Sequence, residues 1–422
     1  MTDSGFKLYI LFVFSWFLHL GSRFSVLGAI RIDLLLVAIL FLISIMNNYE
    51  QESDSQQDNI SKMLIILIAY AILTVPLVEW PGSVLKRGII NFVKAVIFYF
   101  FTVKFIRTER QLKIFIGAFV LFQTFRVLEP VYLHITQGYW GSAASMANWE
   151  FMYRLSGAPS DVINPNGLAF VILTTIPFYY YFFSSTKLTK VLTPAVMIIL
   201  MYALKLTASR SGFLGLIIII ISFIIKTEKK MVLIVVVGLC GIVFFSTLNP
   251  NQKDRYISIF DSSSKNAVTA EGRIEGVKKN FEVAFRRPFF GHGLGTSREA
   301  NANFGNSDKP AHNLYAEVAQ ELGFIGLIIF LFYIKAVIVQ VSSQMKSLRK
   351  RLRPGHFLFK LNNSLQVWFA MNLLFSLASY GVSSYEWYLF PGLCAVLSRI
   401  SGTGFVEEEV QQDAIDKKSA RS

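Results

Sequence analysis

The sequence predicts an all-α polytopic membrane protein with about twelve transmembrane helices, and three observations support this fold class. Hydrophobic residues make up 53% of the 422 residues and the mean hydropathy is +0.49, which is more apolar material than a soluble globule buries. Apolar runs long enough to cross ~30 Å of hydrocarbon recur along nearly the whole chain. Because the strand-like alternation of a membrane barrel is absent, these runs are expected to be helices.

The apolar runs are separated by short polar breaks, which define the expected spans. The first run resembles the apolar core of a signal peptide, but no small-residue cleavage site follows it and a second span comes at once. It is therefore interpreted as a retained first span. The expected spans are 6–20, 26–46, 62–78, 89–106, 112–128, 166–184, 191–207, 212–226, 231–248, 313–340, 363–380 and 386–400.

Lysine and arginine in the short connections predict the orientation of the spans. The basic connections all fall on the same side by parity, and the positive-inside rule makes that side cytoplasmic. The acidic segment 47–61 shares this side, but acidic residues contribute little to orientation. We therefore expect one transmembrane domain over residues 1–400 and a disordered, charged cytoplasmic tail over residues 401–422. The basic connections are 107–113, 187–190, 226–230 and 346–360.

Two long polar segments are expected on the outer side. Residues 129–165 form one, and residues 249–311 form a larger loop between the ninth and tenth spans. A connection this long in a compact domain usually has a function. The larger loop contains an expected amphipathic helix, which would lie on the membrane or cover the helices. Its apolar side would carry Ile274, Val277, Phe281 and Phe285, and its basic side Lys278, Lys279, Arg286 and Arg287.

His312 is the first candidate for chemistry, because it precedes the tenth span on the outer side. Asn313 follows it, and Gly323 and Gly326 lie downstream within roughly 40° of the histidine's helical face. Glycines spaced by three in an apolar helix allow a second helix to approach closely. This arrangement would fix the imidazole at the opening of a tightly packed bundle. The alternative is that His312 only begins a helix.

Three arginines, Arg154, Arg210 and Arg273, share the outer side with His312 and lie at or near helix ends. An arginine at the membrane boundary is costly unless it snorkels or meets an anion. Guanidinium groups bind phosphate oxygens in bidentate fashion. The three arginines therefore predict a site for a lipid-linked phosphate or diphosphate, and interfacial snorkelling of each arginine is the alternative.

Other kinds of site are disfavoured by the residue pattern. The net charge of +14 is divided between the two sides of a membrane, so it does not indicate nucleic acid. No strand precedes the glycine-rich run 291–295, which argues against a nucleotide-binding unit. The five histidines show no metal-binding spacing, although His292 could approach His312 in space. Arg31 and Asp33 are expected to pair within the second span.

Several motifs resemble the signature of the bacterial O-antigen ligase and O-antigen polymerase superfamily. His312, Asn313, Gly323 and Gly326 have the spacing of its histidine motif. The preceding segments LTASRSGFLGL, GRIEGV, RRPFFGHGLGTS and RLSGAPSDVINPNGLA are similar to family segments, and together the motifs cover residues 154 to 330. One departure is Val277, where the ligase motif has leucine.

The resemblance implies a metal-independent membrane glycosyltransferase of GT-C-like fold, with a site that faces the exterior of the bacterial cytoplasmic (inner) membrane. The donor would be an undecaprenyl-diphosphate-linked glycan, the acceptor a glycan or lipid hydroxyl, and the surroundings membrane lipids. His312 would be the general base, Arg210 and Arg273 the diphosphate-binding pair, and Arg154 a further contact. No nucleotide cofactor is implied, because the donor is already activated. Attack from the opposite face would invert the sugar carbon.

The sequence leaves three functions open. A ligase would transfer the glycan to lipid A-core or another surface acceptor, and a polymerase would transfer it to the next lipid-linked repeat. The regular histidine motif and the single large outer loop favour the ligase, whereas Val277 slightly favours the polymerase. A transporter or flippase for lipid-linked sugars is disfavoured, because the spans lack deep ionisable residues that could relay ions.

Overall fold

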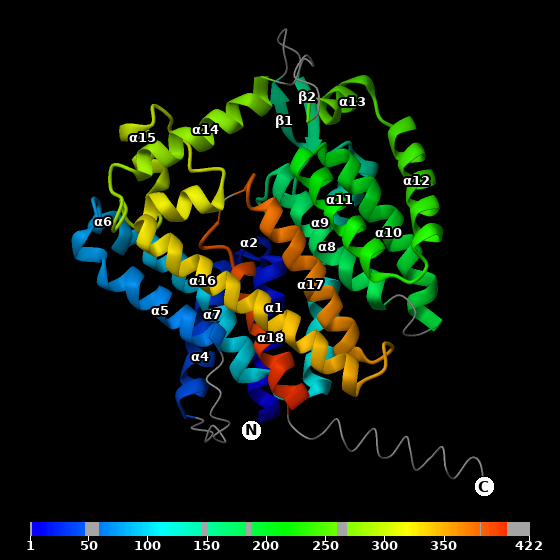
Figure 1. The fold of residues 1–422 in the computed structure, drawn as a ribbon, viewed down its shortest axis with the longest axis horizontal. Helices are drawn as coiled ribbons and strands as arrows, with labels where there is room; N and C mark the ends of the chain where they lie inside the picture. Colours follow the sequence, from blue (N-terminus) through cyan, green and yellow to red (C-terminus); the bar gives the residue numbers. More distant parts are fainter. Residues whose placement is uncertain are drawn as a thin grey trace.

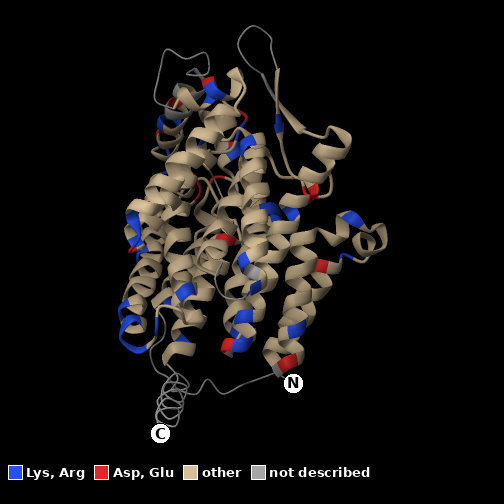
Figure 2. Ribbon diagram, turned by 90° about the vertical axis from the view of Figure 1, so that its right-hand side faces the viewer, with Lys and Arg blue, Asp and Glu red and all other residues tan. Residues whose placement is uncertain are grey.

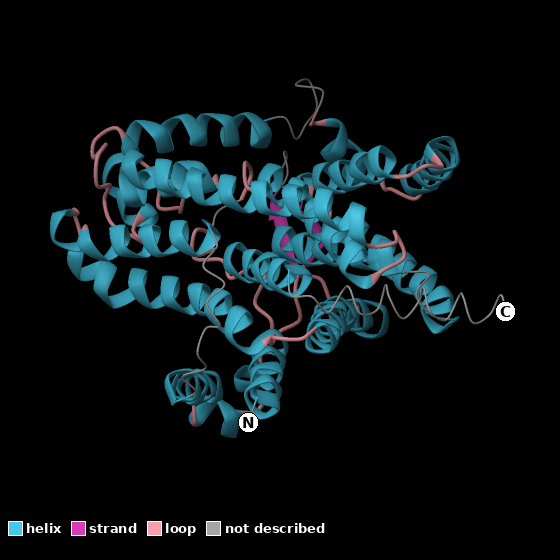
Figure 3. Cartoon of the chain, turned by 60° about the horizontal axis from the view of Figure 1, so that its bottom comes forward, coloured by secondary structure: helices cyan, strands magenta, loops and turns pink. Residues whose placement is uncertain are grey.

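The computed structural model describes residues 2–46, 59–145, 151–182, 187–259, 268–379 and 381–402. Within these ranges the chain consists of helices and one short β-hairpin (Figures 1 and 3). The first part contains α1 (Thr2–Leu18), α2 (Leu20–Arg23), α3 (Ser25–Ala29), α4 (Ile32–Met46), α5 (Asn59–Leu73), the 3₁₀-helix η1 (Val75–Leu77), α6 (Pro81–Ser83), the π-helix η2 (Val84–Gly88), α7 (Ile89–Phe105) and α8 (Glu109–Gln137).

The second part begins with the hairpin and continues through the remaining helices. Its elements are β1 (Gly141–Ser145), β2 (Phe151–Leu155), α9 (Pro165–Phe182), α10 (Lys187–Thr207), α11 (Arg210–Lys226), α12 (Lys230–Ser246), α13 (Pro250–Ile257), α14 (Val268–Ala284), α15 (Ser297–Phe304), α16 (Leu314–Arg351), α17 (Phe357–Phe375) and α18 (Glu386–Gly402).

Every expected span corresponds to a helix, except that 26–46 is divided into α3 and α4. Four helices in the described ranges are long and apolar enough to cross a membrane, and α4, α5 and α12 are shorter apolar helices. These features support an all-α membrane protein. The count of twelve spans and the GT-C-like fold stay predictions. The four long helices are Pro81–Phe105, Glu109–Gln137, Lys190–Thr207 and Leu314–Arg351.

Polar caps explain where several helices begin and end. Thr108 and Gln111 form a capping box at the start of α8, and Gly138 ends that helix with a φ of 68°. Asn249 and Gln252 form a second capping box at α13. Such side chains satisfy the backbone N–H groups that a first helical turn leaves without a partner. The caps therefore fix the junctions between these helices and the loops that precede or follow them.

The core lies where α17 meets its neighbours. This helix packs against α9, α11, α16 and α18, while α18 also packs along α7 and α16 along α5. Trp368 of α17 stacks on Phe390 of α18 with 3.7 Å between ring centroids, and its indole N–H donates to Thr174 Oγ1 at 3.2 Å. By contrast, α12 has no buried residue although it is strongly apolar, as expected of a lipid-facing helix.

The hairpin is an element that the sequence did not predict. Its antiparallel strands pair Gly141 with Leu155 and Ser142 with Arg154. Each strand has five residues and lies in a polar loop, so the sequence shows no alternation of apolar residues that would predict a strand. The hairpin lies near α13 and α14 at one end of the molecule, opposite the N-terminus (Figure 1). Lys and Arg occur at both ends of the bundle and along its length (Figure 2).

The structure has a helix, α14, where the amphipathic helix was expected, and its buried residues differ in part from the predicted ones. Asn280, Val283 and Ala284 are buried, while Phe285 is largely exposed but still contacts Phe324 of α16 with 4.9 Å between ring centroids. A polar contact also joins the two helices, because Gln320 Nε2 donates to Asn280 Oδ1 at 3.5 Å. The sequence pattern had not placed Asn280 on the buried side.

The expected ion pair between Arg31 and Asp33 is wrong. Arg31 is exposed and lies in the turn between α3 and α4, with a left-handed φ of 50°. Asp33 instead accepts a hydrogen bond from Ser15 Oγ at 2.6 Å. Residues two apart lie on nearly opposite sides of an α-helix, so a continuous span would not have paired these side chains either. The tail predicted over 401–422 lies outside the described residues beyond Gly402.

Candidate functional site

The turn between α10 and α11 is the centre of a cluster of buried polar residues on the predicted outer side. Ala208 has a φ of 43°, a left-handed conformation that residues with a Cβ rarely adopt. Ser209 then caps α11, because its Oγ accepts from Gly212 N–H at 3.1 Å. Gly212 allows α11 to start close to α9, since a Cβ there would lie 2.7 Å from Ala169 Cβ. Arg210 is therefore the first residue of α11, directly after the turn.

Arg154 connects strand β2 to this turn. Its Nε donates to the Thr207 carbonyl oxygen at 2.8 Å, and its Nη2 donates to Asn166 Oδ1 at 3.0 Å. The same amide oxygen accepts from Ser209 Oγ at 2.8 Å. Three segments that are distant in sequence, namely β2, the start of α9 and the start of α11, therefore meet at one place. The buried guanidinium of Arg154 belongs to this junction.

Helix α13 contributes a third guanidinium to the same turn. Arg255 Nε donates to the Ala208 carbonyl oxygen at 2.8 Å, and Arg210 Nη1 donates to Ser258 Oγ at 3.0 Å. Burial raises the pKa of Tyr256 to about 12, while the positive charges of Arg154 and Arg255 oppose that shift. Arg154, Arg210 and Arg255 are only 8%, 6% and 7% exposed. We call these three residues the arginine cluster.

Sequence reasoning found Arg154 and Arg210 but missed Arg255. Its segment, QKDRY, carries no motif, and several other basic residues occur in the same outer loop. Only the folding of α13 onto the turn distinguishes Arg255 from them. The predicted residue Arg273 lies on α14, and its side chain is outside the described part of the structure. Its role as the partner of Arg210 stays a prediction.

His312 lies immediately before α16 and is exposed. Asn313, not His312, begins the helix, because its Oδ1 accepts from Ala316 N–H at 3.0 Å. Asn313 Nδ2 also donates to the Leu377 carbonyl oxygen at 2.9 Å, and Leu314 N–H donates to the Ser376 carbonyl oxygen at 3.0 Å. These bonds fix the histidine's backbone beside the end of α17.

The end of α17 also lies close to the arginine cluster. Phe375, its last residue, packs on Phe170 of α9 with ring centroids 4.8 Å apart. Phe170 is about one helical turn from Asn166, which binds Arg154. The His312 segment and the arginine cluster therefore border the same end of α17.

A glycine-rich turn packs against the first half of α16. Gly291, Gly293 and Gly295 have φ values of 72°, 126° and 75°. The turn's Gly293 N–H donates to the Glu321 carbonyl oxygen at 3.0 Å, and Gly295 N–H donates to Glu321 Oε2 at 2.7 Å. These contacts assign the turn a structural role at α16.

The expected glycine face of α16 is wrong, because the helix breaks at Gly323. This residue has φ 70° and ψ 178°, which are not helical. Phe324 N–H donates to the Pro288 carbonyl oxygen at 2.7 Å, so the glycine-rich turn, and not a second helix, approaches Gly323. Gly326 is approached by Tyr70 of α5, whose ring would lie 3.0 Å from an added Cβ. The two glycines are therefore approached by different segments. Because the helix breaks at Gly323, Gly323 and Gly326 do not lie on one helical face with His312.

Replacing Gly323 with alanine is expected to destabilise the protein. Its backbone conformation costs a residue with a Cβ about 1–3 kcal/mol, and the new Cβ would lie 2.3 Å from the Phe289 carbonyl oxygen. Thermal unfolding of the purified protein in detergent measures the loss. Gly238→Ala in α12 is the matched control, because nothing lies within 4 Å of its added Cβ. Equal melting temperatures for the two variants would contradict the assignment.

His292 is part of the packing beneath this turn. Its ring lies between Trp80 and Phe304, with centroid distances of 5.5 and 5.4 Å, and Nε2 is 3.0 Å from the Val283 carbonyl oxygen. Burial lowers the pKa of His292, which favours the neutral ring. Its backbone N–H donates to the Gln320 carbonyl oxygen at 2.7 Å. Through these contacts His292 joins α14 to α16. In the described ranges, His312 is not among the residues that His292 contacts, so the approach considered from the sequence is not observed.

Comparison with known proteins identifies one related family. Residues 195–331 match the family model described as O-antigen ligase. The matched stretch includes Arg210, Arg273, His312, Gly323 and Gly326, whereas Arg154 precedes it. No curated protein shows a significant sequence match to the chain. In the described part of the chain, no group of three or more His, Cys, Asp or Glu residues could hold a metal ion.

Proposed function

We propose that this chain is a membrane glycosyltransferase of the O-antigen ligase superfamily that acts on an undecaprenyl-diphosphate-linked glycan. The ground is the match of residues 195–331 to the family model described as O-antigen ligase. The family supports glycan transfer of the ligase or polymerase type. We further propose that the acceptor is a hydroxyl of lipid A-core or of another surface glycoconjugate. The site would face the exterior of the cytoplasmic membrane, where such a donor is presented.

The convergence of three guanidinium groups on one backbone turn carries this proposal. Arg154, Arg210 and Arg255 come from a strand and two helices, and each is more than nine-tenths buried. Fixed positive groups stabilise the negative charge that develops on a leaving diphosphate. They are also preorganised, because Arg154 and Arg255 are bound to carbonyl oxygens of the turn. Arg273 is proposed as a further phosphate contact from α14.

His312 is proposed as the general base. Its imidazole would accept the proton of the acceptor hydroxyl while the oxygen attacks the anomeric carbon. The bond between that carbon and the diphosphate oxygen breaks, and the diphosphate leaves with its electron pair. Attack opposite the leaving group predicts inversion at the sugar carbon. The exposure of His312 and the anchoring of its neighbour Asn313 support this role.

A deletion strain tests ligase against polymerase. If the protein is a ligase, cells without it are expected to accumulate long polymer on the lipid carrier, while surface acceptors stay unmodified. If the protein is a polymerase, the carrier would bear single repeat units, and Val277 at the ligase motif's leucine position is the residue that favours this outcome. Electrophoresis and mass spectrometry of the lipid-linked and surface glycans measure the difference. Unchanged glycans in both fractions would contradict both enzymatic functions.

A further inference from the structure

His19 has an unusual backbone and a fixed side chain at the junction of α1 and α2. Its φ and ψ are 52° and 48°, in the left-handed region that residues with a Cβ rarely occupy. Strained residues of this kind persist where the surrounding structure holds them, and they are concentrated at functional sites. His19 Nε2 lies 3.0 Å from Asp161 Oδ1, and the side chain remains 34% exposed. The backbone of His19 is therefore held in a strained conformation, while its side chain remains accessible.

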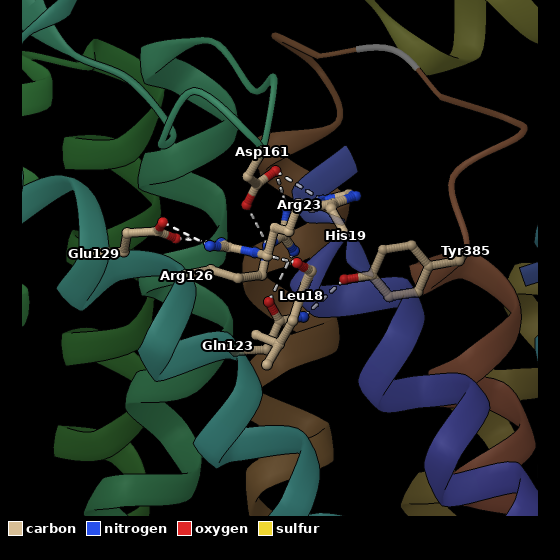
Figure 4. Close-up of polar contacts among 8 residues, drawn as sticks. All are labelled: Leu18, His19, Arg23, Gln123, Arg126, Glu129, Asp161 and Tyr385. Atoms are coloured by element: carbon tan, nitrogen blue, oxygen red, sulfur yellow. Dashed lines mark hydrogen bonds and ion pairs between the residues drawn. The ribbon is translucent and has the colours of Figure 1, made fainter. Parts of the chain in front are cut away.

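Asp161 is a buried carboxylate held by two partners. It also accepts from Arg126 Nε at 2.6 Å and from Arg126 Nη2 at 3.0 Å (Figure 4). Although burial alone would raise it, the hydrogen bonds from His19 and Arg126 and the charge of Arg126 lower the pKa of Asp161 to about 2. An ionised carboxylate can only accept hydrogen bonds, so in the neutral ring Nε2 carries the hydrogen. The lone pair of His19 is then on Nδ1.

The second nitrogen of His19 points away from Asp161 (Figure 4). In the ranges that the structure describes, no residue hydrogen-bonds to Nδ1. A carboxylate that orients one imidazole nitrogen so that the other meets a hydroxyl is a recurring arrangement in active sites. The Asp161–His19 pair therefore presents an oriented hydrogen-bond acceptor at the protein surface.

Two loops from the candidate site converge on this pair. The loop with Asp161 connects strand β2, which carries Arg154, to the start of α9. The connection between α17 and α18 contacts Asn313 through the Leu377 carbonyl oxygen, and it ends at Tyr385. The Tyr385 hydroxyl accepts from Gln123 Nε2 at 2.8 Å, and Gln123 Oε1 accepts from Arg126 Nη1 at 2.9 Å. Arg126 thus links the Asp161–His19 pair, through Gln123, to the connection that also contacts Asn313.

We propose that His19 is a further substrate-binding residue, whose Nδ1 accepts a hydrogen bond from a glycan hydroxyl at the site of transfer. This inference rests on the proposed function. A hydroxyl group fits because it donates a hydrogen, whereas an ionised diphosphate oxygen can only accept one. Arg126 and Asp161 are positioning residues, because they act by fixing the ring. The hydroxyl can belong to the donor glycan or to the acceptor glycan, and the kinetics distinguish the two.

The decisive variant is His19→Gln. A glutamine side chain can still donate N–H to Asp161, but it places no acceptor where Nδ1 was. Loss of one such hydrogen bond is expected to raise KM about 5- to 10-fold with little change in kcat. A raised KM for the lipid-linked donor assigns the hydroxyl to the donor glycan, and a raised KM for the acceptor assigns it to the acceptor. If both KM values equal those of the wild type, the inference is wrong.

His134→Gln is the matched control. The ring of His134 also lies on the predicted outer side, but its Nδ1 is 2.8 Å from the Tyr139 carbonyl oxygen and its ring packs 4.4 Å from Trp140. Its KM values are expected to stay within about twofold of the wild type. A parallel rise in both variants would indicate a general structural effect and overturn the inference.

A binding measurement separates this inference from the proposed function. The probes are oligosaccharide released from the lipid-linked donor by mild acid and deacylated core oligosaccharide, each titrated against the full-length protein in detergent. If the wild type transfers no glycan, the proposed function fails, but weaker binding of one probe by His19→Gln still supports His19 as a glycan contact. Equal binding of both probes by the wild type and His19→Gln rejects it.

Discussion

His312→Ala is expected to lower glycan transfer by about 10³-fold, because positioned general bases contribute about 10²- to 10⁴-fold. The residue is exposed and lies before the first turn of α16, so its loss removes the imidazole without opening the core. The helix start is retained because Asn313 supplies the cap. Transfer is measured with purified protein, lipid-linked donor and acceptor, and the folded state by the melting temperature in detergent.

Asn313→Ala is the structural control for His312. It removes the cap on Ala316 N–H and the bond to the Leu377 carbonyl oxygen, at a cost of about 0.5–2 kcal/mol for the cap. It is expected to lower the melting temperature more than His312→Ala does while keeping measurable transfer. Wild-type transfer by His312→Ala would exclude this residue as the base. The same result would leave the binding role of the arginine cluster open.

Arg210→Ala is the second change with a large expected effect. It removes a buried guanidinium at the start of α11 and its hydrogen bond to Ser258. Loss of one fixed donor that stabilises transition-state charge typically costs about 10²- to 10³-fold in rate. Arg210→Lys keeps the positive charge but cannot bind two phosphate oxygens in a planar, bidentate fashion. We therefore expect Arg210→Lys to lose less of the wild-type transfer rate than Arg210→Ala does.

Arg298→Ala controls for a general loss of positive charge on the outer loop. Arg298 forms an exposed ion pair with Asp308 at 2.8 Å, and such pairs contribute little. Its transfer rate is expected to equal that of the wild type. Binding of the lipid-linked donor to each variant is measured together with the transfer rate. The rates of the folded Arg210 variants and the wild type are then compared at a known fraction of donor-bound protein. Normal donor use by both folded Arg210 variants would refute the diphosphate site.

Much of the fold follows from the sequence, because hydrocarbon thickness and backbone hydrogen bonding allow few structures for long apolar runs. For this reason the expected spans correspond to helices, except that 26–46 is divided into α3 and α4. Local rules failed where polar contacts decided the packing. The polar side chain of Asn280 is buried and contacts Gln320 of α16, and Asp33 accepts a hydrogen bond from Ser15 instead of pairing with Arg31.

The candidate site was accessible to sequence reasoning where a residue belongs to a recognisable motif. His312, Arg210 and Arg154 were proposed in this way, and His312 and Arg210 lie in the stretch 195–331 that matches the family model. Arg255 was missed because its segment carries no motif. Its contact with the Ala208 carbonyl oxygen depends on the return of α13 to a turn more than 40 residues away in the chain. Composition and periodicity contain no information about such a contact.

The sequence by itself determined the class of the protein, the order of its helices and the presence of a histidine and arginines on the predicted outer side. Tertiary structure alone decided which of them meet. It broke α16 at Gly323, where the glycine-rich turn approaches the backbone, and it folded two loops around Asp161 and His19. Helix periodicity extends over a few turns, whereas side chains such as Arg126 and Asp161 meet only after distant segments have packed.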